Sequence, residues 1–210
     1  MQQLDDVIER IRQALDARTA ARDRALVQTR TLTRFCSQAI RAIHRDDRSL
    51  AQENLAEARS LAESLHKELA VYPELYYAGY TQDALKEFAE ASITVALLSE
   101  EPLPQPEEID VEPATYLQGL AETAGELRRR CLDILRNGHS QEAERLLGYM
   151  DDIYAVLVTM DYPDAITGGL RRLTDIVRGV TERTRGDMTI SLRQEQLEDS
   201  LRNLEARLKG

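Results

Sequence analysis

Four glutamates occupy positions where helical segments would place paired carboxylates on one helix face. Glu87 and Glu90 are three residues apart, and Glu122 and Glu126 are four residues apart. In a helix, such spacings leave the Cβ atoms about 5–6 Å apart. Two carboxylates in a poorly solvated place repel each other, so they need a cation or raised pKa values. Because all-oxygen ligands suit Mg²⁺, with Mn²⁺ as a second candidate, the pattern predicts a catalytic metal site.

The segments that carry these pairs are unusually apolar or small. The stretch from Phe88 to Leu98 is apolar nearly all round, which predicts burial. Small residues recur from Gly119 to Gly125 and would let a neighbouring helix approach closely. Two such helices in contact would join four carboxylates. The spacing alone also fits a solvated helix face, on which Glu126 would pair with Arg129 or Arg130.

Other classes of site lack their signatures in this sequence. The three histidines do not show the Glu-x-x-His spacing of a ferritin-like di-iron centre. The glycine motifs that bind phosphate and the GxSxG motif of hydrolases are absent. Cys36 and Cys131 form no CxxC pair, so we expect reduced, buried thiols rather than a zinc site or a disulfide framework.

The charge of the chain bears on its partners. The formal net charge is -10, which argues against non-specific nucleic-acid binding. However, net charge does not give the distribution of charge, and an oligomer can be acidic outside and basic inside. Only Lys67, Lys86 and Lys209 are lysines among 27 basic residues, and arginine suits bidentate phosphate contacts. Residues 1–11 have no signal-peptide core and no apolar run spans a membrane, so we expect a cytoplasmic protein.

Apolar residues recur every three or four positions along most of the chain, and no alternating strand pattern occurs. We therefore predict one all-α domain over residues 1–210, a helical bundle with a long N-terminal helix. Pro73 to Gly79 is expected to form a short helical turn, and residues 101–106 an extended linker. The main helices are predicted at about residues 3–45, 49–69, 82–99, 113–136, 140–160 and 164–208.

Particular residues are expected to bound these helices. Ser49 and Thr81 are predicted to be N-caps, because their hydroxyls can accept a backbone N–H bond. Asn137-Gly138 is a predicted stop, with His139 in a turn and Ser140 opening the next helix. A break is expected near Arg185–Asp187. Leu197, Leu201, Leu204 and Leu208 form a short seam of coiled-coil spacing.

Several segments resemble one known family. Tyr116–Leu127 (YLQGLAETAGEL) is similar to the Trax pattern DYLLGVADLTGELMR, and Glu87–Ala91 (EFAEA) to its EYVEA segment. Arg41–Arg45 resembles the end of the family's first helix, and Arg185-Gly186 the Arg-Gly of its last helix. The resemblance covers roughly residues 22–186. The family is translin/Trax (Trax is translin-associated factor X), and the chain resembles an archaeal-type Trax-like protein most.

The resemblance implies an all-α fold of about seven helices and hollow oligomers, commonly octamers, that enclose single-stranded or short duplex nucleic acid. It also implies a Mg²⁺-dependent endoribonuclease. Glu87 and Glu90 match the acidic pair of Trax on its middle helix. Glu126 matches a further glutamate, and Glu122 stands where Trax has an aspartate, one methylene shorter.

The basic stretch of translin has no counterpart, because Tyr76–Tyr80 (YYAGY) occupies its place. We therefore expect RNA contacts elsewhere, from a set of arginines on two helices: Arg34, Arg41, Arg45, Arg129 and Arg130.

Three functions are compatible with the sequence. The first is a metal-dependent endoribonuclease acting inside an oligomeric shell, which is a homo-oligomer, an octamer by analogy, or an assembly with a second translin-family subunit. The second is a non-catalytic, translin-like RNA- or single-stranded-DNA-binding protein. The third is a structural helical adaptor whose paired carboxylates are only surface charges.

Overall fold

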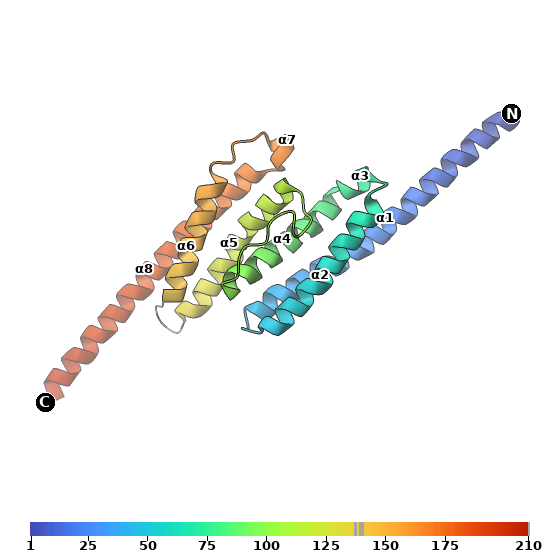
Figure 1. The fold of residues 1–210 in the computed structure, drawn as a ribbon. Helices are drawn as coiled ribbons and strands as arrows, with labels where there is room; N and C mark the ends of the chain where they lie inside the picture. The colour runs from blue at the N-terminus through green and yellow to red at the C-terminus, as the bar shows by residue number, and fades with distance from the viewer. Residues whose placement is uncertain (137, 139–140, 210) are drawn as a thin grey trace. The chain divides into compact units, whose positions relative to one another are not determined.

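The computed structural model describes residues 1–136, 138 and 141–209. This part of the chain contains eight helices and no strand, which confirms the all-α prediction (Figure 1). Two of the helices, α3 and α7, are single turns. The helices are α1 (Gln2–Ile43), α2 (Arg48–Leu69), α3 (Pro73–Tyr76), α4 (Gly79–Ser99), α5 (Pro113–Leu135), α6 (Gln141–Leu157), α7 (Asp164–Thr167) and α8 (Leu170–Lys209).

The helices form two compact units, residues 1–119 and 120–210. The division falls inside α5, which continues through it as one helix. The single domain predicted over the whole chain stays a prediction.

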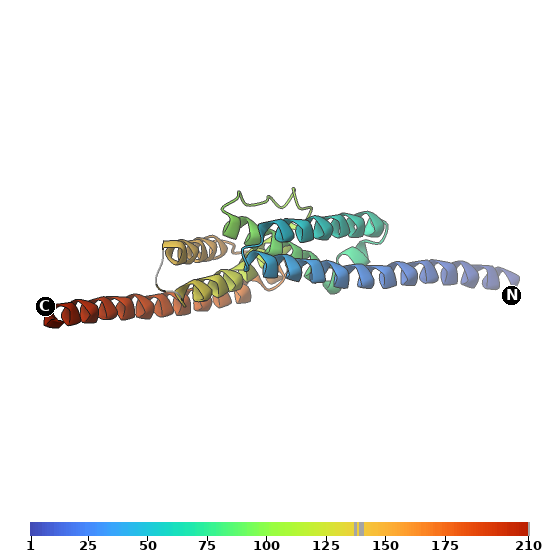
Figure 2. The same cartoon turned by 90° about the horizontal axis from the view of Figure 1, so that it is seen from below.

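The first unit is built on the second half of α1. Helices α2 and α4 both pack against this half, and Figure 2 shows α2 lying along it. The core between them consists mostly of aliphatic side chains, and its most buried members include Leu32, Leu65, Leu85 and Phe88, each at most 1% exposed. The N-terminal part of α1 extends beyond α2, and residues 2–20 are exposed.

The second unit pairs α6 with α8. Ala143, Leu147 and Met188 form a buried cluster, with Ile134 of α5 packed against it. Arg128 of α5 also binds Asp187 of α8 at 2.8 Å. Residues 192–208 of α8 extend beyond these contacts and are exposed.

The extended linker predicted at residues 101–106 is confirmed, and the residues after it are anchored. Ile109 and Val111 are buried in the core of the first unit. The Arg59 guanidinium donates to the Glu108 carbonyl at 2.6 Å, and the Tyr116 hydroxyl donates to the Pro104 carbonyl at 2.9 Å. These bonds fix the entry into α5.

Two predicted N-caps are wrong. Asp47, not Ser49, caps α2, because its carboxylate accepts the Leu50 N–H at 3.1 Å. Thr81 lies inside α4, which begins at Gly79. The Thr81 hydroxyl donates to the Leu75 carbonyl at 2.8 Å and is fully buried, so it joins α3 to α4 instead of capping a helix.

The predicted break near Arg185–Asp187 is also wrong, because α8 runs without interruption from Leu170. Ion pairs to Asp151 and Arg128 hold Arg185 and Asp187 on either side of Gly186. The chain turns earlier, at Gly168 and Gly169, whose φ values of 59° and 87° favour glycine.

Some predicted boundaries lie outside the described residues, namely Asn137, His139 and Ser140. Among the helices that the structure describes, none has the length and apolar character needed to cross a membrane.

Candidate metal centre

Glu87 and Glu90 lie on α4 among side chains that are almost all inaccessible to solvent. Phe88 and Ala89 between them are at most 1% exposed, and both glutamates are half-buried. The spacing of three residues places the two carboxylates one helical turn apart on adjoining positions. The apolar run in the sequence therefore does position an acidic pair at the edge of the core.

Besides burial, the negative charges of this pair affect the pKa of a cysteine on α1, Cys36. Burial is the largest cause that raises the pKa of the Cys36 thiol, and the negative charges of Glu87 and Glu90 raise it further. Cys36 is fully buried, so both carboxylates lie close to the core contact between α1 and α4. Low local solvation is the condition under which paired carboxylates favour a bound cation.

Helix α5 approaches α4 at this same segment through Gly119. A Cβ atom at Gly119 would lie 2.8 Å from the Ala89 Cβ, 2.9 Å from the Glu90 backbone nitrogen and 2.9 Å from the Lys86 carbonyl oxygen. Such distances leave no room for a side chain. The missing side chain of Gly119 therefore allows the backbones of α4 and α5 to come into contact beside the acidic pair.

Glu122 follows Gly119 by one turn of an unbroken helix, so it lies near the same contact. One carboxylate oxygen each of Glu87, Glu90 and Glu122 can be chosen so that all three lie within 4.8 Å of one another. Three carboxylate ligands suit a hard divalent cation that prefers oxygen, such as Mg²⁺ or Mn²⁺. The donor set thus fits the predicted metal.

Glu126 is not part of this group of three. It lies one turn further along α5 and is half-buried, and its carboxylate contacts the Arg129 guanidinium at 3.5 Å. Of the four predicted ligands, Glu87, Glu90 and Glu122 have carboxylate oxygens close to one another. The fourth, Glu126, has Arg129 as a basic partner.

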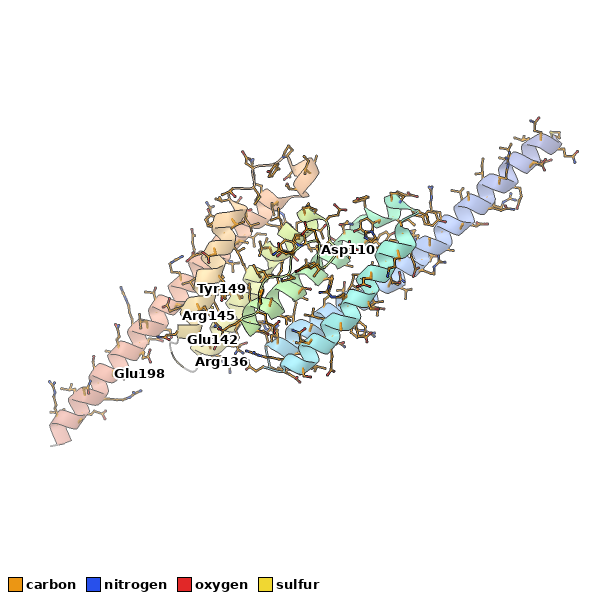
Figure 3. The ribbon with its side chains drawn as sticks, in the orientation of Figure 1. Asp110, Arg136, Glu142, Arg145, Tyr149 and Glu198 are labelled. Atoms are coloured by element: carbon orange, nitrogen blue, oxygen red, sulfur yellow. The ribbon has the colours of Figure 1, made fainter. Side chains whose placement is uncertain are left out.

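The predicted arginines of α5 have acidic partners. Arg129 pairs with Glu126, while Arg130 binds Glu142 of α6 at 3.2 Å and is only 17% exposed. Figure 3 shows Glu142 on α6. Because Arg130 is largely buried in the second unit, a phosphate would have to compete with Glu142 for its guanidinium.

Arg34 and Arg41 lie exposed on one side of α1, whereas Arg45, predicted on the same helix, is exposed in the turn after its last residue, Ile43. Arg34, Arg41 and Arg45 follow spacings of seven and four residues, and Arg34 lies over the Phe35 ring at 5.3 Å. No acidic residue occurs between Arg24 and Arg45, which gives this half of α1 a positive charge in a chain that is acidic overall.

The sequence predictions missed a further arginine on this side, Arg30. It is exposed, and it has no ion-pair or hydrogen-bond partner in the part of the chain that the structure describes. The sequence could have indicated Arg30 as a further candidate for RNA contact, because it lies one turn before Arg34 in a stretch without acidic residues.

Solved structures with the same fold belong to C3PO proteins. The structure of AfC3PO in complex with duplex RNA has a TM-score of 0.83 and 34% sequence identity, and the match covers 90% of this chain and 98% of AfC3PO. A second structure, the crystal structure of AfC3PO, gives a TM-score of 0.82 and 33% sequence identity, with the same coverage of both chains. Apo-NeC3PO gives 0.81 over 88% of this chain and 96% of that one, but at 21% identity it supports the fold alone.

A sequence relative covers a similar share of the chain. Uncharacterized protein MJ0175 of Methanocaldococcus jannaschii is 32% identical over 188 residues, which are 89% of this chain and 83% of the relative. No protein-family model matches this chain.

Proposed function

This chain belongs to the translin/Trax family, and from that premise we propose that it binds RNA and cleaves it with a divalent cation. The observation that carries the proposal is the convergence of three carboxylates, from Glu87, Glu90 and Glu122, within 4.8 Å. The 34% identity with AfC3PO, which forms a complex with duplex RNA, supports RNA as the substrate.

The carboxylates have two tasks in this mechanism. Glu87, Glu90 and Glu122 hold the cation, and Glu126 completes the set of four from the next turn of α5. With Mg²⁺ or Mn²⁺ held by these carboxylates, the site would gain Lewis-acid chemistry toward the phosphodiester and the attacking water. A carboxylate of the set orients the attacking water and accepts its proton.

A cleavage assay tests the proposal. A labelled single-stranded RNA and a short RNA duplex are incubated with the purified protein in Mg²⁺, in Mn²⁺ and in EDTA. We expect cleavage with the metals and none in EDTA. Binding without cleavage under all conditions would indicate a non-catalytic translin-like protein, and absence of RNA binding even at low salt would indicate a structural adaptor, because phosphate contacts are strongest there.

We also propose that the chain assembles with further copies of itself, as an octameric shell by analogy with the family. Support comes from two exposed apolar seams, each with spacings of four, three and four residues that are typical of coiled coils. The side chains of the first seam are 45% to 58% exposed and those of the second 53% to 78%. The first seam is Leu4, Ile8, Ile11 and Leu15 on α1, and the second is Leu197, Leu201, Leu204 and Leu208 on α8.

The charges beside the second seam favour a parallel pairing of two copies of α8. Arg193 and Arg207 flank one side of the seam, and Glu198 and Glu205 flank the other. In a parallel pair, Arg193 of one copy faces Glu198 of the other, whereas an antiparallel pair brings like charges together. Figure 3 shows Glu198 on this exposed part of α8.

We expect Ile8→Asp and Leu201→Asp each to weaken the assembly at least about tenfold, since burial of one such side chain contributes about 1.5–3 kcal/mol. Light scattering after size-exclusion chromatography gives the mass of the particle. Val27→Asp is the matched control, because Val27 is 63% exposed on α1 but lies opposite the seam. A monomeric wild type, or assembled variants of unchanged mass, would contradict the proposal.

A further inference from the structure

A hollow lies between α1 and α4 in the first unit, next to the acidic pair. Its volume of about 480 Å³ is in the range of sites that hold small ligands. Its wall on α1 carries Arg30 and Thr33, and its wall on α4 carries Tyr80, Asp83 and Glu87. Glu87 is also a proposed metal ligand, so anything bound in the hollow lies beside the metal centre.

Arg30 gives the hollow a cationic group that is free to bind an anion. It is exposed and has no acidic partner within the described residues. Other arginines of α1 differ in this respect, since Arg18 pairs with Glu74 at 2.9 Å and Arg24 lies 3.6 Å from Glu68. A phosphate diester at the mouth of the hollow would supply the missing negative charge.

Tyr80 gives the hollow a hydrogen-bonding group without a partner. Its ring is half-buried, and its hydroxyl oxygen is buried without a hydrogen-bond partner among the residues that the structure describes. Leaving a buried polar group unpaired costs about 1–3 kcal/mol, and a ligand that reaches this hydroxyl from the hollow would offset that cost. A phenol both donates and accepts, which suits a sugar hydroxyl.

Asp83 limits what the ligand can be. Its exposed carboxylate lines the same hollow one turn before Glu87, so this wall repels a phosphate and attracts a hydrogen-bond donor. A ligand that fits must carry an anionic group on the side of Arg30 and hydroxyl groups on the side of α4. A ribonucleotide within a strand has both, and its 2′-hydroxyl distinguishes it from DNA.

We propose that this hollow is the subsite for the nucleotide next to the phosphate that is cleaved. Arg30 binds the phosphate on the far side of that nucleotide, while the Tyr80 hydroxyl and the Asp83 carboxylate bond to its ribose hydroxyls. The inference rests on the proposed function, because it assumes an RNA strand at the metal centre. It adds the residues that position the strand and that select RNA over DNA.

The test measures binding of a fluorescein-labelled single-stranded RNA and of a DNA of the same sequence, by fluorescence anisotropy in EDTA. We expect Arg30→Gln to weaken RNA binding about tenfold at low salt. The slope of the logarithm of the binding constant against the logarithm of the salt concentration should become about one smaller in magnitude. Arg18→Gln is the control, because it removes the same charge from the same helix at a residue that already has a partner.

Tyr80→Phe tests the choice of sugar and keeps the ring that packs in the wall. We expect it to weaken RNA binding about threefold to tenfold, the range of one hydrogen bond, and to leave DNA binding unchanged. Circular dichroism checks that each variant is folded as the wild type is.

The outcomes separate the inference from the proposed function. If the wild type binds RNA but Arg30→Gln binds as tightly as Arg18→Gln, the subsite is refuted and the nuclease proposal stands. Equal losses for RNA and DNA in Tyr80→Phe refute the selection of ribose. If the wild type binds no RNA, the proposed function itself fails and the subsite with it.

Discussion

Replacing Glu90 or Glu122 by glutamine is expected to abolish metal-dependent RNA cleavage while RNA binding persists. Each substitution keeps the shape of the side chain but removes one negative charge from the group of three carboxylates. Loss of an outer-shell partner of a metal site already costs 10–100-fold, so loss of a direct ligand is expected to lower the cleavage rate by more than about 100-fold. The rate of cleavage in Mg²⁺ under single-turnover conditions measures the effect.

Binding of the metal itself gives an independent measurement. Isothermal titration calorimetry with Mn²⁺ should show weaker metal binding in both variants than in the wild type. Glu57→Gln is the matched control, since Glu57 is an exposed glutamate of α2 and lies outside the group. Cleavage at the wild-type rate in both Glu90→Gln and Glu122→Gln would refute the assignment of these residues as metal ligands.

The second large effect is expected at Gly119, which touches no metal. In Gly119→Ala, the new Cβ would lie 2.8 Å from the Ala89 Cβ and 2.9 Å from two backbone atoms of α4. Backbone atoms cannot move aside as a flexible side chain can, so α5 must shift away from α4. Overpacking of this kind lowers the free energy of unfolding by about 1–3 kcal/mol. The shift also separates Glu122 from Glu87 and Glu90, so metal binding and cleavage should fall together.

Gly125→Ala is the control on the same helix. A Cβ at Gly125 meets no atom within 4 Å, and alanine favours a helix over glycine by up to about 1 kcal/mol. Urea denaturation should therefore show a less stable Gly119→Ala and a Gly125→Ala that is as stable as the wild type or more so. Equal stability and equal Mn²⁺ affinity in Gly119→Ala would show that the close helix contact does not position the carboxylates.

The helices were predictable because their signal is local. Apolar residues three and four positions apart define one face of the long α1, whereas the apolar residues of the buried α4 lie on nearly all of its faces. The ends of helices were harder to predict. Ser49 and Thr81 are good capping residues. However, Ser49 lies inside α2 and Asp47 before it accepts the Leu50 N–H, while the Thr81 hydroxyl donates to the Leu75 carbonyl outside its own helix.

Long-range contacts also decided the course of α8. Gly186 weakens a helix in isolation, which is why the sequence predicted a break there. In the protein, Arg185 and Asp187 bind residues of α6 and α5, and these contacts offset the cost of the glycine. The pair Gly168 and Gly169 adopts positive φ values instead, which a helix cannot accommodate.

The sequence by itself determined that two helices each carry a pair of carboxylates, and that small residues on the second helix permit close contact. Only the tertiary structure decided that Glu122 joins Glu87 and Glu90, and that a hollow with Arg30 and the unpaired Tyr80 hydroxyl opens beside them. The physical reason is the range of the interactions. Helical period depends on neighbours within four residues, whereas a shared site depends on helices that meet across tens of residues of intervening chain.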